Sequence, residues 1–250
     1  MKVLIVKKDG IKIEKELEIL KEYDIQIVDE YPEYILTFGG DGTILRALKY
    51  AIKYMVPILA VNFGRVGYMA DIDSKYFRTR IEELLDNNFN LSKRYLLECS
   101  INDKKYYALN EIAFKFDRVG ELVLYDEDKE ISGFRGDGLI ISTPTGSTAY
   151  AMSAGGSIIH PSVKVMNIVA IAPQYLGTRP LILPEKNLVV KSNAKIYIDG
   201  KQKSHFCPQV NVKYSDKYVQ LIEPKDKNFY YILRKKLDWR GKKWKELKCF

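Results

Sequence analysis

A glycine-rich segment at residues 39–43, Gly-Gly-Asp-Gly-Thr, constrains the first part of the chain more than any other feature. The apolar run Tyr34–Phe38 comes directly before it, and apolar residues at helical spacing follow it from Ile44 to Met55. This pattern predicts a buried strand and an amphipathic helix joined by a glycine loop. Such an order directs free backbone N–H groups and a helix N-terminus toward one place, which suits phosphate binding.

Asp41 is out of place in a loop that only binds phosphate, because a carboxylate repels an anion. It makes sense if it is linked to a metal ion, or if it acts as a base on a substrate hydroxyl. The alternative is an acid at a helix start that the helix dipole stabilises and that takes no part in chemistry. The loop by itself leaves these interpretations open.

The first 92 residues alternate between strand and helix patterns. Strands are expected at Lys2–Lys7, 25–28, Tyr34–Phe38 and 57–61. Helices are expected at 13–23, 44–55 and 77–85. Ser74 is the expected N-cap of the last helix. The alternation predicts a parallel sheet flanked by helices.

From about Leu91 onward, short β-type runs replace this alternation. They lie at 93–101, 105–116, 121–125, 139–142, 165–172, 188–191, 195–199, 210–214 and 218–222. Such runs predict an antiparallel sandwich or barrel, in which only 148–153 has helical character. We therefore expect an N-terminal α/β nucleotide-binding domain at 1–92 and an all-β domain, a β-sandwich, at 93–228. A tail at 229–250 is expected to return to the first domain.

A second glycine-rich segment, residues 136–156, combines glycines with many serine and threonine hydroxyls. These groups offer hydrogen bonds at short reach, which suits ribose and amide groups, and this favours a ligand-binding loop over a plain surface loop. The pair Asn110 and Glu111 lies at an expected strand end. Such a pair is common in turns, but it could also clasp vicinal ribose hydroxyls, with the asparagine donating to a base.

Composition narrows the class of protein. Hydrophobic residues make up 46% of the 250 residues, which is enough for a packed core, and charges interrupt every run that could span a membrane. The cysteines, Cys99, Cys207 and Cys249, are odd in number and far apart, which favours a reduced protein in the cytoplasm. Two histidines provide no zinc-site spacing.

The formal charge of +8 suits a polyanionic partner, either a nucleic acid or a small ligand such as ATP or a dinucleotide. No nucleic-acid-binding signature accompanies the charge, so neither a nucleic acid nor a membrane is expected as a partner. The chain also lacks the Gly-x4-Gly-Lys-Ser/Thr loop and the protein-kinase signatures. A standard P-loop enzyme is therefore not expected.

Together these segments resemble the NAD kinase family, the enzymes that phosphorylate NAD to NADP, over nearly the whole chain. Besides 39–43, the matching motifs are Asn-Phe-Gly-Arg-Val-Gly-Tyr at 62–68, Asn-Glu at 110–111, Gly-Asp-Gly at 136–138, Thr-Pro-Thr-Gly-Ser-Thr-Ala-Tyr at 143–150 and Thr-Arg-Pro-Leu at 178–181. They occur in the family's order and approximate spacing. The first motif alone is also shared with diacylglycerol and sphingosine kinases, so the combination carries the resemblance.

The resemblance implies that Asp41 lies beside the adenosine ribose of NAD and acts as the general base. The residues it implies for NAD binding are Asp41, Gly42, Tyr68, Asn110, Glu111, Asp137, Thr148, Ala149, Tyr150, Ser153 and Ala172. Tyr68 would form the adenine side and Asp137 would lie near the nicotinamide end. Gly39, Gly40, Gly42 and Thr43 would line the donor phosphates, with Arg179 as a further candidate for a phosphate contact.

The same resemblance implies Mg²⁺ as the divalent metal, with no protein ligand assigned to it, and a homo-oligomer, a dimer or a tetramer. The donor is ATP, another nucleotide or polyphosphate. Two departures stand out: residues 64–68 read Gly-Arg-Val-Gly-Tyr where many members have Gly-x-Leu-Gly-Phe, and a lysine is inserted in Asp-Gly-Lys-Gln at 199–202. The alternative functions are a lipid kinase of the diacylglycerol type and a non-catalytic NAD(P) sensor.

Overall fold

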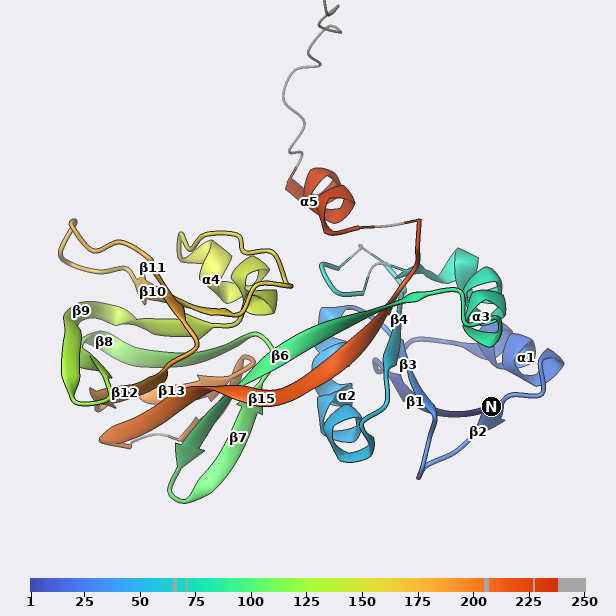
Figure 1. The fold of residues 1–250 in the computed structure, drawn as a ribbon, viewed down its shortest axis with the longest axis horizontal. Coiled ribbons are helices and arrows are strands. Elements are labelled where there is room, and N and C mark those ends of the chain that lie inside the picture. The colour runs from blue at the N-terminus through green and yellow to red at the C-terminus, as the bar shows by residue number, and fades with distance from the viewer. Residues whose placement is uncertain (65–66, 71, 205–206, 227, 238–250) are drawn as a thin grey trace, which may run out of the picture. The chain divides into compact units, whose positions relative to one another are not determined.

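The computed structural model describes residues 1–64, 67–70, 72–204, 207–226 and 228–237 (Figure 1). The chain forms two compact units. Unit 1 is Met1–Ser92 together with the segment that begins at Gln220, and unit 2 is Lys93–Val219. The boundaries expected from the sequence, 92–93 and 228–229, stay predictions, and the end of the tail, 238–250, lies outside the described residues.

Unit 1 contains a parallel sheet. Its strands are β1 (Lys2–Lys7), β2 (Gln26–Ile27), β3 (Tyr34–Phe38), β4 (Ile58–Asn62) and β5 (Ile72–Asp73). The order is β2-β1-β3-β4, and β4 also pairs in parallel with β5 and with Leu221, near the end of β15 (Gln209–Glu223). All of β4 and all but the first residue of β3 are buried, as expected for parallel strands covered on both faces.

Helices cover both faces of this sheet (Figure 1). They are α1 (Glu14–Glu22), α2 (Asp41–Tyr54) and α3 (Phe77–Leu85). Unit 1 also contains the 3-10 helix η1 (Ser74–Tyr76) and helix α5 (Phe229–Leu237). Helix α2 packs against β1, β3 and β4, whereas α1 packs against α3 on the opposite face. There, Leu20 of α1 and Ile81 of α3 share one core with Leu36 and Val61 of the sheet.

The helix start near residue 74 differs from the prediction. The cap is Asp73, whose Oδ1 accepts a hydrogen bond from the Lys75 N–H at 3.1 Å. Ser74 is already the first residue of η1, because a 3-10 turn precedes α3. The prediction of Ser74 as N-cap is therefore wrong: the helical segment begins earlier than the apolar spacing indicates, and the carboxylate one residue upstream reaches the free N–H.

Unit 2 is built from antiparallel strands. They are β6 (Asn90–Ile101), which starts in unit 1, β7 (Lys104–Ala108), β8 (Glu111–Asp126), β9 (Lys129–Ser142), β10 (Val165–Ile171), β11 (Leu181–Pro184), β12 (Asn187–Ser192), β13 (Lys195–Ile198), β14 (Lys201–Ser204) and the first part of β15. The order β11-β10-β9-β8-β12-β15 runs through unit 2, and β13 joins β8 to β14. The short helices η2 (Thr145–Thr148) and α4 (Tyr150–Ser153) follow β9.

The long strand β8 organises unit 2. Its first residues pair with β13, at Ile198↔Ile112, and its last residues pair with β12, at Leu188↔Asp126. An irregularity in its pairing with β9, between Lys115 and Gly120, separates the two parts. The sequence predicts two separate runs here because the polar residues of the irregularity interrupt the alternation.

The predicted fold class, an α/β domain followed by an all-β domain, is confirmed. The core of unit 2 gathers residues from most of its strands and includes Cys99 and Cys207, which are buried and unbridged. Cys249 and His205 lie outside the described residues. Within the part of the chain that the structure describes, no helix has both the length and the hydropathy to cross a bilayer.

Candidate active site

The carboxylate of Asp41 is the centre of the site in unit 1. Gly40, in extended conformation, precedes α2, and Asp41 is the first residue of the helix. Oδ2 of Asp41 accepts a hydrogen bond from the Tyr68 N–H at 2.9 Å. Oδ1 accepts two more, from the N–H groups of Met69 at 3.1 Å and Ala70 at 2.8 Å. Asp41 therefore does more than begin a helix, because a second loop is folded around its charge.

The loop around Asp41 has its own internal support. The carbonyl of Ala70 accepts hydrogen bonds from the Gly67 N–H at 2.8 Å and from Nδ2 of Asn62, at the end of β4, at 3.0 Å. Three consecutive N–H groups from this loop converge on one carboxylate, which fixes its position and orientation. Arg65 and Val66 of the same motif lie outside the described residues.

The glycine loop before α2 is closely packed at its first residue. A β-carbon on Gly39 would lie 2.1 Å from Oγ1 of Thr43, whereas Gly40 and Gly42 have open space at the same position. The Gly39 N–H donates to the Val61 carbonyl at 2.9 Å, which ties the loop to β4. The open side of Gly40 and Gly42 at the start of a 14-residue helix is where an anion can approach the backbone.

Tyr68 joins Asp41 to the end of the described chain. Its ring is half-buried, and burial raises the pKa of its phenol, with a further contribution from the charge of Asp41. The ammonium of Lys236, in α5, lies 4.7 Å from the centre of this ring. A role for Lys236 was not predicted from the sequence, since a lysine in a basic tail carries no positional signal.

In unit 2, Asp199 holds the turn between β7 and β8. Its Oδ2 accepts from the Leu109 N–H at 2.9 Å, and its Oδ1 accepts from the N–H groups of Asn110 at 2.8 Å and Glu111 at 3.2 Å. Burial raises the pKa of Asp199, although these hydrogen bonds oppose the shift. This role of Asp199 was not predicted from the sequence. The signal was Asp-Gly at 199–200, where Asp199 adopts a positive φ of 47°.

Asn110 and Glu111 are both buried, and each has an acceptor atom without a partner among the described residues, Oδ1 of Asn110 and Oε2 of Glu111. Burial raises the pKa of Glu111 to about 7, the charge of Asp199 adds to this, and the Tyr150 N–H opposes it. A buried acceptor without a donor is costly. The pair is therefore suited to bind hydroxyl or amide donors of a ligand.

The segment after β9 packs tightly onto Asn110. Thr143 donates its N–H to the Asn110 carbonyl at 2.8 Å, and its hydroxyl to the Leu109 carbonyl at 2.6 Å. A β-carbon on Gly146 would lie 2.0 Å from the Asn110 carbonyl oxygen. The structure thus brings Asn110 and Glu111 together with the segment that holds Thr148, Ala149 and Tyr150.

The remaining candidates lie elsewhere in unit 2. Asp137, Ser153 and Ala172 are exposed, and Ala172 lies beside Gly136, where a β-carbon would come within 2.8 Å of the Ala172 carbonyl oxygen. The guanidinium of Arg179 donates to the carbonyls of Leu176 and Thr178. Gln202, next to the inserted lysine, accepts a hydrogen bond from the Tyr197 hydroxyl at 3.0 Å.

Comparisons with known proteins match both units. A family model described as the ATP-NAD kinase N-terminal domain matches residues 8–89, and one described as the ATP-NAD kinase C-terminal domain matches residues 109–223. The chain is 38% identical to an NAD kinase of Fusobacterium nucleatum subsp. nucleatum, over 93% of this chain and 94% of the relative. It is 34% identical to an NAD kinase of Azotobacter vinelandii, over 89% and 83% of the two chains.

Two solved structures share the fold. One is yeast NADH kinase complexed with NADH, with a TM-score of 0.87 at 21% identity, covering 97% of this chain and 89% of that one. The other is an NAD kinase from Archaeoglobus fulgidus in complex with ATP, with a TM-score of 0.82 at 27% identity, covering 96% and 100%.

The chain combines an α/β unit, which has an acid at a helix N-terminus, with an all-β unit, and both units match models of one family. The class of protein is therefore a two-domain phosphotransferase. The chain belongs to the NAD kinase family. The predicted enzyme class is thereby confirmed.

Proposed function

We propose that this NAD kinase transfers the terminal phosphoryl group of ATP or polyphosphate to the adenosine 2′-hydroxyl of NAD, with Asp41 as the residue that receives or orients the hydroxyl proton. The observation that carries the proposal is the carboxylate of Asp41 held by three backbone N–H groups at the start of α2. A group held in this way acts without reorganisation when the hydroxyl arrives.

The hydrogen bonds leave room for one more donor. Oδ1 of Asp41 accepts two of the three N–H groups and Oδ2 accepts one, so Oδ2 is the oxygen with capacity for the ribose hydroxyl. Phosphoryl transfer through a loose transition state needs little proton removal before the phosphorus–oxygen bond to the leaving group lengthens. Orientation of the hydroxyl is then the larger part of the role of Asp41.

Donor phosphates would lie at the N-terminus of α2, along Gly39, Gly40, Gly42 and Thr43. The open faces of Gly40 and Gly42 support this assignment, because a phosphate can contact their backbone without meeting a side chain. ATP is bound in the solved structure from Archaeoglobus fulgidus, which supports ATP as a donor.

Mg²⁺ fits this site only as an ion that arrives with the donor phosphates. Among the described residues, no group of three or more His, Cys, Asp or Glu side chains could form a metal cage. Mg²⁺ keeps several waters of its own, and the free position on Oδ2 of Asp41 is assigned to the ribose hydroxyl, so the donor phosphates and water would hold the ion. When bound, the ion would neutralise charge on the donor phosphates.

The dinucleotide would be held in unit 2 by Asn110 and Glu111, whose unpartnered oxygens accept hydroxyl or amide donors. Thr148, Ala149, Tyr150 and Ser153 would complete this contact, Asp137 and Ala172 would lie toward the nicotinamide, and Tyr68 would form the adenine side. A homo-oligomer, a dimer or a tetramer, belongs to the same proposal and rests on the family alone, whereas a cytoplasmic location rests on the three scattered cysteines.

The test is NADP formation by the purified protein with NAD and Mg²⁺, compared between ATP, polyphosphate and no donor. NADP formed with one donor and not without it is the expected result. Tight binding of NAD or NADP without any turnover would contradict the proposal and favour a sensor. Phosphorylation of diacylglycerol in place of NAD would favour the lipid kinase.

A further inference from the structure

Helix α5 presents a basic final turn to the segment that surrounds Asp41. It buries Ile232 and Leu233, while Lys235 and Lys236 are exposed. The Lys236 ammonium lies 4.7 Å from the centre of the Tyr68 ring, within the range of a cation–π contact.

Lys235, the neighbouring lysine of the same turn, also acts on this part of unit 1 through its charge. The pKa of Asp73 is lowered mainly by the hydrogen bond from the Lys75 N–H, and the charge of Lys235 adds to the effect. The contact of Lys236 with the Tyr68 ring places the last turn of α5 beside this residue.

Tyr68 links α5 to the carboxylate of Asp41, because its ring contacts the helix and its backbone N–H contacts the carboxylate. Its N–H donates to Oδ2 of Asp41 at 2.9 Å, and the N–H groups of the next two residues donate to Oδ1. Only two side-chain torsions, χ1 and χ2, connect the ring of a tyrosine to its backbone, and each prefers a few staggered values. Restraining the ring of Tyr68 therefore restrains the N–H groups that orient Asp41.

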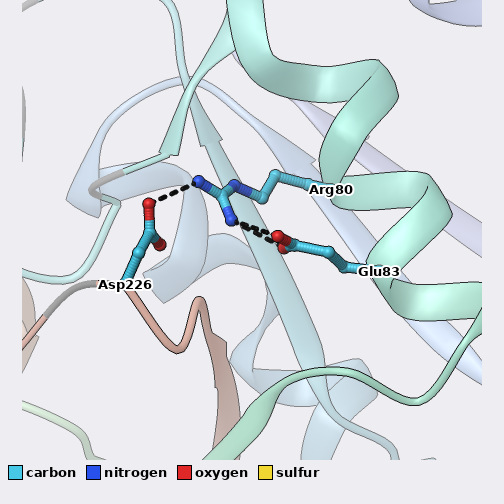
Figure 2. A network of polar contacts seen from close by, with 3 residues as sticks. All are labelled: Arg80, Glu83 and Asp226. Atoms are coloured by element: carbon cyan, nitrogen blue, oxygen red, sulfur yellow. Dashed lines mark hydrogen bonds and ion pairs between the residues drawn. The ribbon is translucent and has the colours of Figure 1, made fainter.

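An ion-pair network around the buried Arg80 anchors the segment that leads to α5 (Figure 2). Nη1 of Arg80, in α3, donates to both carboxylate oxygens of Glu83 at 2.8 and 2.6 Å. Nη2 donates to Oδ2 of Asp226 at 3.1 Å, and Asp226 lies between β15 and α5 in the chain. The Arg80 side chain is only 8% exposed, so its charge depends on these two carboxylates.

We propose that α5 is a positioning element for Asp41. In this account Arg80 and Asp226 anchor the approach to α5, and Lys236 holds the Tyr68 ring so that the loop N–H groups stay on the carboxylate. The effect on catalysis rests on the proposed function of Asp41, whereas the effect on the loop does not. Lys236 acts here through Tyr68 and Asp41 and is a positioning residue.

The test compares Lys236→Met and Lys236→Arg with Lys235→Met, which removes the same charge one residue away. Two quantities are measured: kcat and KM for NAD, and hydrogen exchange of the Tyr68, Met69 and Ala70 amides without substrates. We expect Lys236→Met to lower kcat by about five-fold, the size of one cation–π contact, and to speed exchange at these amides. Lys236→Arg should restore both, and Lys235→Met should change neither.

The two readouts separate this proposal from the proposed function. Unchanged exchange in Lys236→Met, or an equal effect of Lys235→Met, would overturn the positioning role even if the enzyme is fully active. Wild-type protein without NADP formation would refute the proposed function, and the exchange experiment would still decide whether α5 holds the loop.

A second variant tests the anchor without leaving a buried charge alone. Asp226→Asn weakens the exposed end of the network and leaves Glu83 paired with Arg80. The control is Glu22→Gln, which removes a comparable exposed ion-pair partner from Arg78, also in α3. We expect Asp226→Asn to speed exchange at the same three amides, and Glu22→Gln to have no effect there. Combined with Lys236→Met, Asp226→Asn should add little, because both act through one contact. Fully additive effects would overturn the shared route.

Discussion

Gly67 and Asp41 lie so close together that a β-carbon on Gly67 would come within 2.0 Å of Oδ1 of Asp41. Oδ1 is also the oxygen that accepts the N–H groups of Met69 and Ala70. No side chain can therefore occupy position 67 while the carboxylate keeps its hydrogen bonds. The second glycine of the 62–68 motif, Gly67, therefore lets the Asp41 carboxylate lie against the loop backbone.

Gly67→Ala should displace the Asp41 carboxylate and lower kcat by about ten-fold or more, with a loss of about 1–3 kcal/mol in the free energy of unfolding. Gly64→Ala is the matched control in the same loop, since a β-carbon there meets nothing within 4 Å. Steady-state kinetics and denaturant unfolding of both variants measure the difference. Equal behaviour of the two alanine variants would refute the steric argument.

Asp199 is expected to stabilise the fold of unit 2, because three backbone N–H groups depend on its carboxylate. Asp199→Ala leaves the N–H groups of Leu109, Asn110 and Glu111 without their acceptor, so we expect a loss of about 3 kcal/mol or more. The KM for NAD should rise because Asn110 and Glu111 lose their support. Asp117→Ala, which removes only an exposed partner of Lys195, should change unfolding by less than about 1 kcal/mol.

Glu111 should make stability depend on pH. Burial, with the charge of Asp199, raises its pKa from 4.5 to about 7, so the folded protein holds this proton more tightly than the unfolded chain. Its contribution to the free energy of unfolding is then full below pH 4.5, falls as pH rises to about 7, and is constant above. Glu111→Gln should remove this fall, which is about 3 kcal/mol over the window.

The matched comparison for this pH effect is Glu98→Gln, because Glu98 is expected to change the free energy of unfolding with pH in the opposite direction. Burial acts to raise the pKa of Glu98, but Lys105 and Lys213 outweigh it and the pKa is lowered. Its stabilisation is present at neutral pH and is lost in acid, below pH 4.5. Urea unfolding of the wild type and both variants from about pH 2 to 8 gives the two slopes, each as the difference between wild type and variant. Slopes of the same sign in both variants would contradict the assignment.

Local patterns predicted much of unit 1. The buried runs at Tyr34–Phe38 and 57–61, and the helical stripe after Asp41, follow from periodicity, because short-range spacing decides them. In unit 2, β14 and the start of β9 were not predicted, since their polar residues give no alternation and pairing with neighbours holds them as strands. Strand β11, Leu-Ile-Leu-Pro, was not predicted either, because a run of four residues without alternation gives no strand pattern, and its pairing with β10 holds it.

The supports of the candidate site could not be predicted because they join distant parts of the chain. Asp41 meets N–H groups that lie 27 to 29 residues later, and Asp199 meets N–H groups 88 to 90 residues earlier. Motifs indicated Asp41 and Glu111, but spacing along a sequence does not tell which backbone donor meets which carboxylate. The roles of Asp199 and Gly67 therefore come from the structure.

The most direct test of the central claim is the turnover number of Asp41→Asn, measured with NAD affinity and unfolding of the same variant. Asp9→Asn, which changes an exposed acid of unit 1, is the control. We predict that Asp41→Asn folds and binds NAD but forms NADP about 10²- to 10⁴-fold more slowly, while Asp9→Asn is unaffected. Near-normal turnover by Asp41→Asn would contradict the account.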